Sequence, residues 1–127
     1  MQEAKKPQRV LVADDEPHIR AIVAMKLRAA GYEVQEAGDG QEALAICRET
    51  CPHLVITDLQ MPAMSGLELC QALKREAPTS HVPALLLTAR GFLVSDEQLA
   101  GTNIRSVRSK PFSVRDVLSD AEKLLAA

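Results

Sequence analysis

Short apolar runs alternate with longer amphipathic stretches five times along the chain. An apolar run bounded by polar clusters is typical of a buried strand, whereas apolar residues that recur every three or four positions predict a helix with one buried face. The predicted strands cover residues 9–13, 33–37, 53–57, 83–88 and 104–109. The predicted helices cover residues 17–31, 41–51 and 65–77, a short segment that begins at Ser95, and residues 113–126.

This alternation predicts an α/β fold. Five strand–helix units imply a parallel sheet that is covered by helices on both faces and connected by right-handed crossovers. Residues 84–87 read Ala-Leu-Leu-Leu, which is typical of a strand buried on both faces. Residues 104–109 include two arginines and two serines, so we expect an edge strand there, where charge discourages pairing with other chains. The length of 127 residues fits one such domain.

Composition and charge exclude several classes of function. Fifteen Lys plus Arg against seventeen Asp plus Glu give a net charge of −2, without the basic excess of a nucleic-acid or membrane surface. Aromatic residues make up 2% of the chain, which argues against stacking platforms for bases or flavins. No apolar run approaches the ~20 residues of a membrane span, and residues 1–8 lack the apolar stretch of a signal peptide. We expect a soluble, cytoplasmic protein.

The three cysteines do not indicate a disulfide framework or a zinc site. Their number is odd, and a domain of this length needs no disulfides. Cys47 and Cys51 could share one face of a helix, but no second ligand pair follows at zinc spacing. We therefore interpret Cys47, Cys51 and Cys70 as small, mostly buried apolar residues.

Polar and charged residues follow the predicted strands at their carboxyl ends, where parallel α/β sheets bind ligands. Acidic residues in loops are usually only solvated, and Asp14 and Asp15 could simply open the helix that follows them. Several carboxylates at one site, however, raise each other's pKa unless a cation is present. A single lysine leaves excess negative charge and room for a divalent metal. The residues at these strand ends are Asp14, Asp15, Glu16, Asp58, Thr88 and Lys110.

The chemistry of these residues indicates phosphoryl transfer. Oxygen ligands without a nearby cysteine or histidine favour Mg²⁺, with Mn²⁺ as an alternative, over zinc. Mg²⁺ usually takes only one or two protein carboxylates and leaves positions for phosphate oxygens. Asp58 can act as the nucleophile, Thr88 can donate a hydrogen bond to one phosphoryl oxygen, and Lys110 can bind another.

Five segments, in order, resemble the response-regulator receiver domain of two-component signalling. They are the pair Asp14-Asp15, Asp58 at the end of Leu54-Val-Ile-Thr-Asp58, Met61-Pro62 followed by Ser65-Gly66, Thr88-Ala89, and Lys110-Pro111-Phe112. The resemblance implies a flavodoxin-like (βα)5 three-layer sandwich with a five-stranded parallel sheet in the order 2-1-3-4-5. It also implies that residues 9–127 form the receiver domain and residues 1–8 a polar tail.

The resemblance assigns the phosphoacceptor and the metal ligands. Asp58 would accept a phosphoryl group from a histidine kinase or a histidine phosphotransfer protein. Mg²⁺ would be bound by Asp15, Asp58 and the main-chain carbonyl of Gln60, and by Asp14 either directly or through a water. The domain would catalyse only its own phosphorylation and dephosphorylation.

The resemblance also assigns the phosphate-binding residues. Thr88 and Lys110 would bind phosphoryl oxygens, and the small side chain of Ala89 would leave room for an attacking water. Gln60 and Arg90 occupy positions that tune autodephosphorylation in the family. A downstream protein target would bind the face formed by the helix that begins at Ser95, the strand 104–109 and the helix 113–126, and we expect no nucleic-acid or membrane contact.

One position departs from the family. The usual switch pairs the threonine, here Thr88, with an aromatic ring three residues before the lysine, and this chain has Val107 there. We interpret Val107 as a small core residue of the edge strand, too short to swing as a ring does. The hypothesis is therefore that activation reorders residues 90–103, with the strand 104–109 as a fixed docking surface. Arg105, Arg108 and Arg115 would form either a basic outer face suited to an acidic partner or a merely solvated edge.

Three other functions share parts of this pattern. A pseudo-receiver usually lacks an acidic-pair residue, the acceptor or the lysine, all of which are present here. A flavodoxin-like cofactor carrier needs hydroxyls and free amides after the first strand, where this chain is acidic. A haloacid-dehalogenase-type phosphatase needs Asp-x-Asp at that position, which the chain lacks. The sequence fits both a stand-alone receiver and a receiver within a longer protein.

Overall fold

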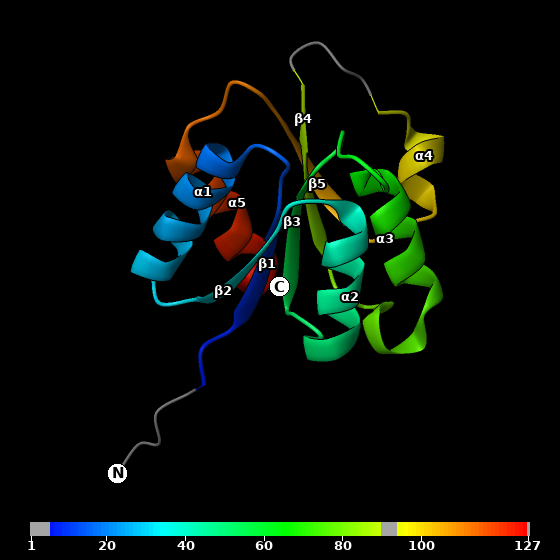
Figure 1. Ribbon diagram of the computed structural model, residues 1–127, viewed down its shortest axis with the longest axis horizontal. Helices are drawn as coiled ribbons and strands as arrows, with labels where there is room; N and C mark the ends of the chain where they lie inside the picture. The colour runs from blue at the N-terminus through cyan, green and yellow to red at the C-terminus, as the bar shows by residue number, and fades with distance from the viewer. Residues whose placement is uncertain (1–5, 90–93, 127) are drawn as a thin grey trace.

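The computed structural model describes residues 6–89 and 94–126, in which five parallel strands form one sheet (Figure 1). The order β2-β1-β3-β4-β5 confirms the predicted fold class and strand order. Every residue of β3 and β4 is buried, whereas β2 and β5 have exposed residues, so the prediction of an edge strand over residues 104–109 is confirmed. The strands are β1 (Arg9–Ala13), β2 (Glu33–Ala37), β3 (Leu54–Asp58), β4 (Ala84–Thr88) and β5 (Ile104–Ser109).

Helices cover both faces of the sheet, so the domain has three layers (Figure 1). α1 (Pro17–Ala29) and α5 (Val114–Ala126) pack on one face, and α2 (Gly40–Thr50) and α3 (Gly66–Arg75) pack on the other. The short α4 (Asp96–Ala100) lies on the side of α3. Within the described residues, none of these helices is long and apolar enough to cross a membrane.

The helix ends follow from local signals. Ser65 and Ser95 each form a capping box, in which the serine hydroxyl accepts a hydrogen bond from the backbone N–H three residues later and that residue's side chain accepts one from the serine N–H. The predicted helix start at Ser95 is therefore confirmed. α3 ends at Arg75, two residues before its predicted end, because Glu76 is extended and a proline lies in the separate 3₁₀ turn Ala77–Thr79.

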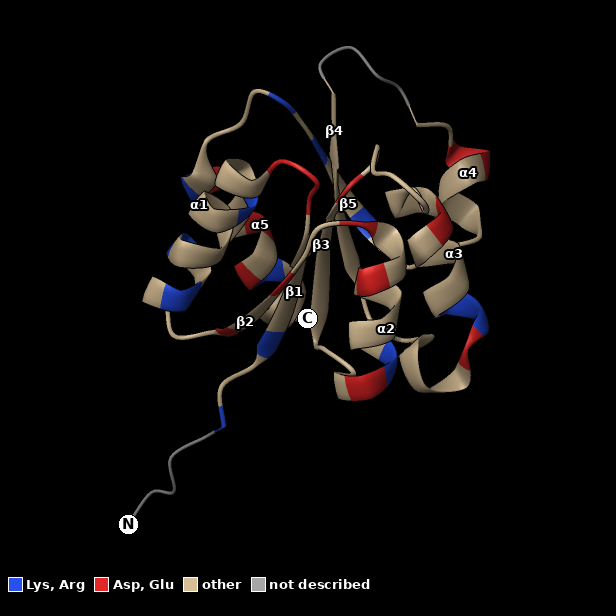
Figure 2. Ribbon diagram, in the orientation of Figure 1, with Lys and Arg blue, Asp and Glu red and all other residues tan. Residues whose placement is uncertain are grey.

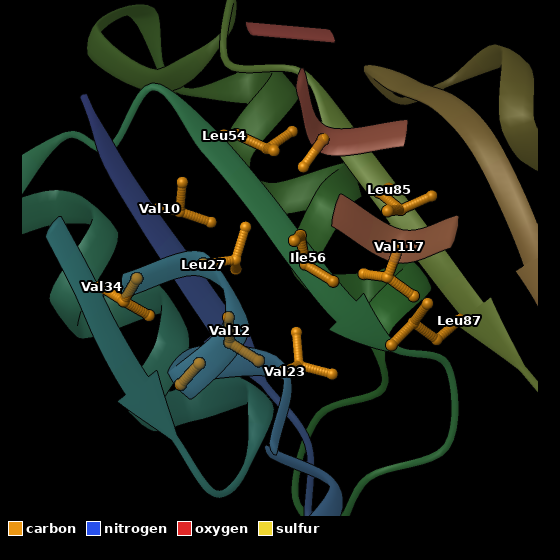
Figure 3. Packing of buried hydrophobic residues seen from close by; sticks show 12 residues of the cluster. Val10, Val12, Val23, Leu27, Val34, Leu54, Ile56, Leu85, Leu87 and Val117 are labelled. Atoms are coloured by element: carbon orange, nitrogen blue, oxygen red, sulfur yellow. The ribbon is translucent and has the colours of Figure 1, made fainter. Parts of the chain in front are cut away.

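The sheet separates two hydrophobic clusters. Successive side chains of a strand point to opposite faces, so Val10 and Val12 of β1 pack with α1 and α5, while Leu11 packs with α2 and α3. Figure 3 shows the first cluster, in which Val117 of α5 lies against side chains of β3 and β4. The central strands are therefore held from both sides, and their carboxyl ends are fixed positions for functional side chains.

The predicted burial is wrong for Cys51 and Val107, and one apolar residue of α1 is also exposed. Ile22 is 47% exposed, because Val23, Ala24 and Leu27 are the buried residues of α1. Cys51 is only partly buried, because it ends α2 in a left-handed conformation at φ 48°, while the other two cysteines are buried as predicted. Val107 is 42% exposed, because alternate residues of the edge strand β5 face solvent.

Candidate functional site

The carboxyl ends of four strands bring the predicted site residues to one edge of the sheet. Asp58 and Thr88 are the last residues of β3 and β4. Asp14 follows β1, and Lys110 follows β5. In Figure 2 the acidic turn after β1 and the acidic end of β3 lie together at this edge. The sequence-based expectation that these side chains converge agrees with this placement.

Three carboxylates form a compact cluster. One oxygen from each of Asp14, Asp15 and Asp58 lies within 4.8 Å of the other two, and only Asp15 is exposed. The backbone N–H of Glu16 donates to Oδ1 of Asp14 over 2.9 Å, which orients that carboxylate. Oδ2 of Asp14 is buried and has no hydrogen-bond partner among the described residues. The backbone of Asp14 is also held, because Arg20 donates to its carbonyl over 2.9 Å.

The cluster is electrostatically unfavourable in its charged form. Burial, and after it the neighbouring Asp14 and Asp15, raise the pKa of Asp58, whereas Lys110 lowers it, and the net pKa is about 6. Burial also raises the pKa of Asp14, although the Glu16 amide and Lys110 act in the opposite direction. The site therefore favours any ligand that adds positive charge.

Lys110 brings the positive charge into this cluster. Its Nζ lies 3.4 Å from Oδ1 of Asp58, 3.7 Å from Oδ2 of Asp14 and 3.4 Å from Oε1 of Glu16. Burial lowers the pKa of Lys110, but the three carboxylates outweigh this effect and the net pKa is raised. Its backbone N–H donates to the carbonyl of Thr88 over 2.8 Å, which ties the end of β5 to β4. The contact with Glu16 was not predicted from the sequence; its only sequence signal is the position beside the acidic pair.

A cavity of about 250 Å³ opens over the carboxylates and is lined by Asp15, Glu16, Asp58, Gln60, Ala89 and Lys110. The exposed Ala89 leaves this space open. Thr88, which precedes Ala89 in the chain, is buried, and its hydroxyl has no hydrogen-bond partner in the described part of the chain. A buried hydroxyl without a partner is a donor available to a ligand, at a cost in free energy while no ligand is bound.

Gly66 allows the segment between β3 and α3 to fold back against the site. Its N–H donates to the carbonyl of Leu59 over 2.8 Å. A Cβ atom at this position would collide with the carbonyl oxygen of Asp58. The sequence analysis included Ser65-Gly66 only as part of the resemblance; the structural reason for the glycine is this close approach to the backbone of Asp58.

The remaining predicted residues do not join the cluster. Val107 lies on the exposed side of β5, so its interpretation as a core residue is wrong. Arg108 points the other way and is paired with Asp120 at 2.6 Å and Asp116 at 3.8 Å, so it is not part of a free basic face as predicted. Arg90 lies outside the described residues.

The donor set fits a hard divalent cation. The cluster consists of carboxylate oxygens and includes no described cysteine or histidine, and this is the ligand chemistry of Mg²⁺. The buried Oδ2 atom of Asp14 is an acceptor that such an ion would satisfy. The open cavity would leave room for water or phosphate oxygens in the other coordination positions.

Comparisons with known proteins identify the family. The family model of the response regulator receiver domain matches residues 10–122. The DNA-binding dual master transcriptional regulator RpaA of Synechocystis sp. is 36% identical over 117 residues, which are 92% of this chain and 48% of that regulator. The chain spans about half the length of the curated relatives that it matches first.

Solved structures share the fold. The chemotaxis response regulator CheY4 of Vibrio cholerae superimposes with a TM-score of 0.85 at 30% identity, over 94% of this chain and 99% of that one. The receiver domain of the sensor histidine kinase PA1611 from Pseudomonas aeruginosa, whose structure has a magnesium ion in the active site cleft, gives a TM-score of 0.85 at 20% identity, over 96% and 100% of the two chains. The chain therefore belongs to the response regulator receiver domain family, whose general function is an aspartate phosphorylation switch in two-component signalling.

Proposed function

We propose that Asp58 accepts the phosphoryl group from a histidine kinase or a histidine phosphotransfer protein in a Mg²⁺-dependent reaction. The observation that carries this proposal is the position of its carboxylate, which lies 3.4 Å from the Lys110 ammonium and lines the open cavity. The same carboxylate belongs to the cluster with Asp14 and Asp15. A carboxylate nucleophile in phosphoryl transfer needs this combination of access and nearby positive charge.

Mg²⁺, or alternatively Mn²⁺, would be held by the carboxylates of Asp14, Asp15 and Asp58 and by the main-chain carbonyl of Gln60. The buried Oδ2 atom of Asp14 supports this assignment, because it accepts no hydrogen bond from any described residue and faces the Lys110 ammonium only at 3.7 Å. The magnesium ion in the PA1611 receiver is consistent with it. When bound, the ion would neutralise negative charge on the phosphoryl oxygens.

The proposed reaction exchanges one bond for another. An oxygen of the Asp58 carboxylate attacks phosphorus, the phosphorus–nitrogen bond of a phosphohistidine breaks, and the imidazole leaves with a proton from solvent. Lys110 would pair with one phosphoryl oxygen, and the hydroxyl of Thr88, which has no hydrogen-bond partner among the described residues, would donate to another. Attack by a water admitted beside Ala89 would release phosphate and restore Asp58. The domain would then catalyse only its own phosphorylation and dephosphorylation.

An apolar groove beside the site supports a protein as the phosphodonor. The groove has a volume of about 420 Å³, lies between α1 and the start of α5, and is lined by Ile19, Ile22 and Phe112. Lys110 lines both this groove and the cavity over Asp58. A donor protein that buries these apolar side chains would therefore hold its phosphohistidine next to Asp58.

The output surface in this proposal is the face formed by α4, β5 and α5, where a downstream protein target would bind. Arg105 and Val107 are exposed on β5 and would contact that target. Residues 90–103 would reorder on phosphorylation, although residues 90–93 lie outside the described part of the chain. We place this exchange in the cytoplasm, as is typical of the family, without direct contact to nucleic acid or membranes.

The phosphoacceptor can be tested by intact-mass spectrometry. Incubation with a small phosphodonor and Mg²⁺ should add one phosphoryl group to the wild-type chain and none to Asp58→Asn. Asp96→Asn, which changes an exposed aspartate on α4, should be labelled like the wild type. Equal labelling of Asp58→Asn would overturn the assignment, and no labelling of the wild type would favour a receiver that binds partners without phosphorylation.

A further inference from the structure

Glu16 occupies the N-cap position of α1, but its side chain contacts Lys110 instead of capping the helix. Glu16 is the N-cap residue of α1 and has the extended backbone of a cap, but its side chain makes no capping hydrogen bond. Instead its Oε1 atom lies 3.4 Å from Nζ of Lys110, 94 residues away along the chain. The carboxylate is therefore used at the site and not at the helix end.

Glu16 differs from the other two carboxylates that contact Lys110. The side chains of Asp14 and Asp58 are 1% and 8% exposed and form the floor of the site, whereas that of Glu16 is 49% exposed. Glu16 also lines the cavity that the phosphoryl group would occupy. A phosphoryl group on Asp58 would need the Lys110 ammonium and would bring its own negative charge close to Glu16.

We propose that Glu16 is a positioning residue that holds Lys110 in the unphosphorylated domain and competes with the phosphoryl oxygens for it. The inference rests on the proposed function and adds to it a residue that lowers the affinity of the site for its phosphorylated state. Phosphorylation would then release Glu16 from Lys110, so that α1 loses its link to the end of β5 as the site is filled.

The proposal predicts effects of opposite sign on two ligands. Without the charge of Glu16, Lys110 is free to bind phosphoryl oxygens, and the repulsion between Glu16 and those oxygens is removed. The same change leaves the charge of Lys110 less neutralised and removes one negative charge near the carboxylate cluster. The affinity for Mg²⁺ should therefore fall. A loss of local structure would instead lower the affinity for both ligands.

The test compares Glu16→Gln with a control, Glu49→Gln, which also removes one negative charge. Glu49 lies near the C-terminal end of α2, is exposed and makes no ion pair with any described residue. Isothermal titration calorimetry would measure the affinity for Mg²⁺ alone and for beryllofluoride, a phosphoryl mimic, at saturating Mg²⁺. Glu16→Gln should bind beryllofluoride roughly two- to fivefold more tightly, the range for a partly exposed ion pair. Glu49→Gln should match the wild type for both ligands.

Two further measurements make the result decisive. Glu16→Ala, which removes the acceptor as well as the charge, should change both affinities in the same directions, and the ¹⁵Nζ resonance of Lys110 should shift in both Glu16 variants. Unchanged or weaker beryllofluoride binding by the Glu16 variants would overturn the inference and leave the proposed function standing. Failure of the wild type to bind beryllofluoride at all would overturn the proposed function, and the inference with it.

Discussion

Asp58 is placed where its charged form is unfavourable. Burial and two neighbouring carboxylates raise its pKa to about 6, and the single ammonium of Lys110 only partly offsets them. Thr88 is similar in kind, because its buried hydroxyl has no partner among the described residues. At the residue scale, the groups proposed to bind the phosphoryl group are therefore those that reduce the stability of the ligand-free domain.

Asp58→Asn should stabilise the metal-free domain in a pH-dependent way. Because the folded-state pKa of Asp58 is raised, the folded state binds more protons than the unfolded state between about pH 4 and pH 6, and wild-type stability falls as pH rises through this range. Above this range the variant should be more stable by roughly 3 kcal/mol, because the pKa is raised from 3.8 to about 6 and each pKa unit corresponds to about 1.4 kcal/mol. Near pH 4 the difference should vanish. Urea unfolding in the presence of EDTA, near pH 4 and above pH 6, measures the difference in stability between variant and wild type. A gain that does not depend on pH would contradict the electrostatic explanation.

Thr88→Val should separate stability from ligand binding. Valine keeps the branched shape but removes the unsatisfied hydroxyl, so the ligand-free domain should gain about 1 kcal/mol. The affinity for beryllofluoride should fall roughly tenfold, because a hydrogen bond to a charged group is lost. Thr79→Val is the matched control, since the Thr79 hydroxyl is equally buried but donates to the carbonyl of Leu73 over 2.8 Å. Thermal melting of the ligand-free variants should show that Thr88→Val is stabilised and that Thr79→Val is destabilised. Stabilisation of both variants would mean that the unpaired hydroxyl does not explain the gain of Thr88→Val.

At the element scale, the hydrophobic pattern was sufficient to predict the five strands of the described sheet and the four longer helices that cover it, α1, α2, α3 and α5, whereas the start of α4 was predicted from the local signal at Ser95. The pattern works because β3 and β4 are buried on both faces and the helices bury one stripe each. It did not predict the side chains at the margins. Ile22 and Val107 are apolar, but one lies at the rim of α1 and the other on the outer side of an edge strand, and periodicity does not distinguish a margin from a core.

The α4 region should respond to a phosphoryl mimic more than β5 does. None of the five residues of α4 is buried, so its displacement costs little packing free energy. β5 is held by its pairing with β4 and by the ion pair between Arg108 and Asp120 at 2.6 Å. Backbone amide chemical shifts with and without beryllofluoride should therefore change most over residues 90–103. Large changes confined to Val107 and its strand neighbours would show that the readout runs through β5 instead.

At the scale of the whole molecule, the position of the site could be predicted because parallel strands deliver their carboxyl ends to one edge. The sequence therefore indicated that Asp14, Asp58, Thr88 and Lys110 lie together. It did not indicate that Glu16 contacts Lys110 or that Gly66 touches the backbone of Asp58. Both contacts depend on how segments between the strands fold back over the edge, which strand order alone does not determine.

Mg²⁺ should stabilise the entire domain against thermal unfolding. An ion that binds only the folded state adds about 2.7 kcal/mol at one hundred times its dissociation constant, so the melting temperature of the wild type should rise with Mg²⁺ at constant ionic strength. Asp15→Asn should reduce this rise, because Asp15 belongs to the carboxylate cluster and is exposed, so its replacement leaves the core unchanged. Asp96→Asn should respond like the wild type. A wild-type melting curve unmoved by Mg²⁺ would place the metal elsewhere.

The order of the site residues along the chain has a consequence for folding. All three clustered carboxylates lie within the first 58 residues, whereas the ammonium that contacts two of them follows β5, the last strand. A partly folded intermediate that pairs β1 with β3 before β5 has docked would hold this negative charge without Lys110. Electrostatic repulsion therefore disfavours a half-formed sheet. Docking of the last strand completes the hydrogen bonds of β4 and brings the Lys110 ammonium to the carboxylates, which partly offsets their charge and couples the two halves of the domain into one cooperative transition.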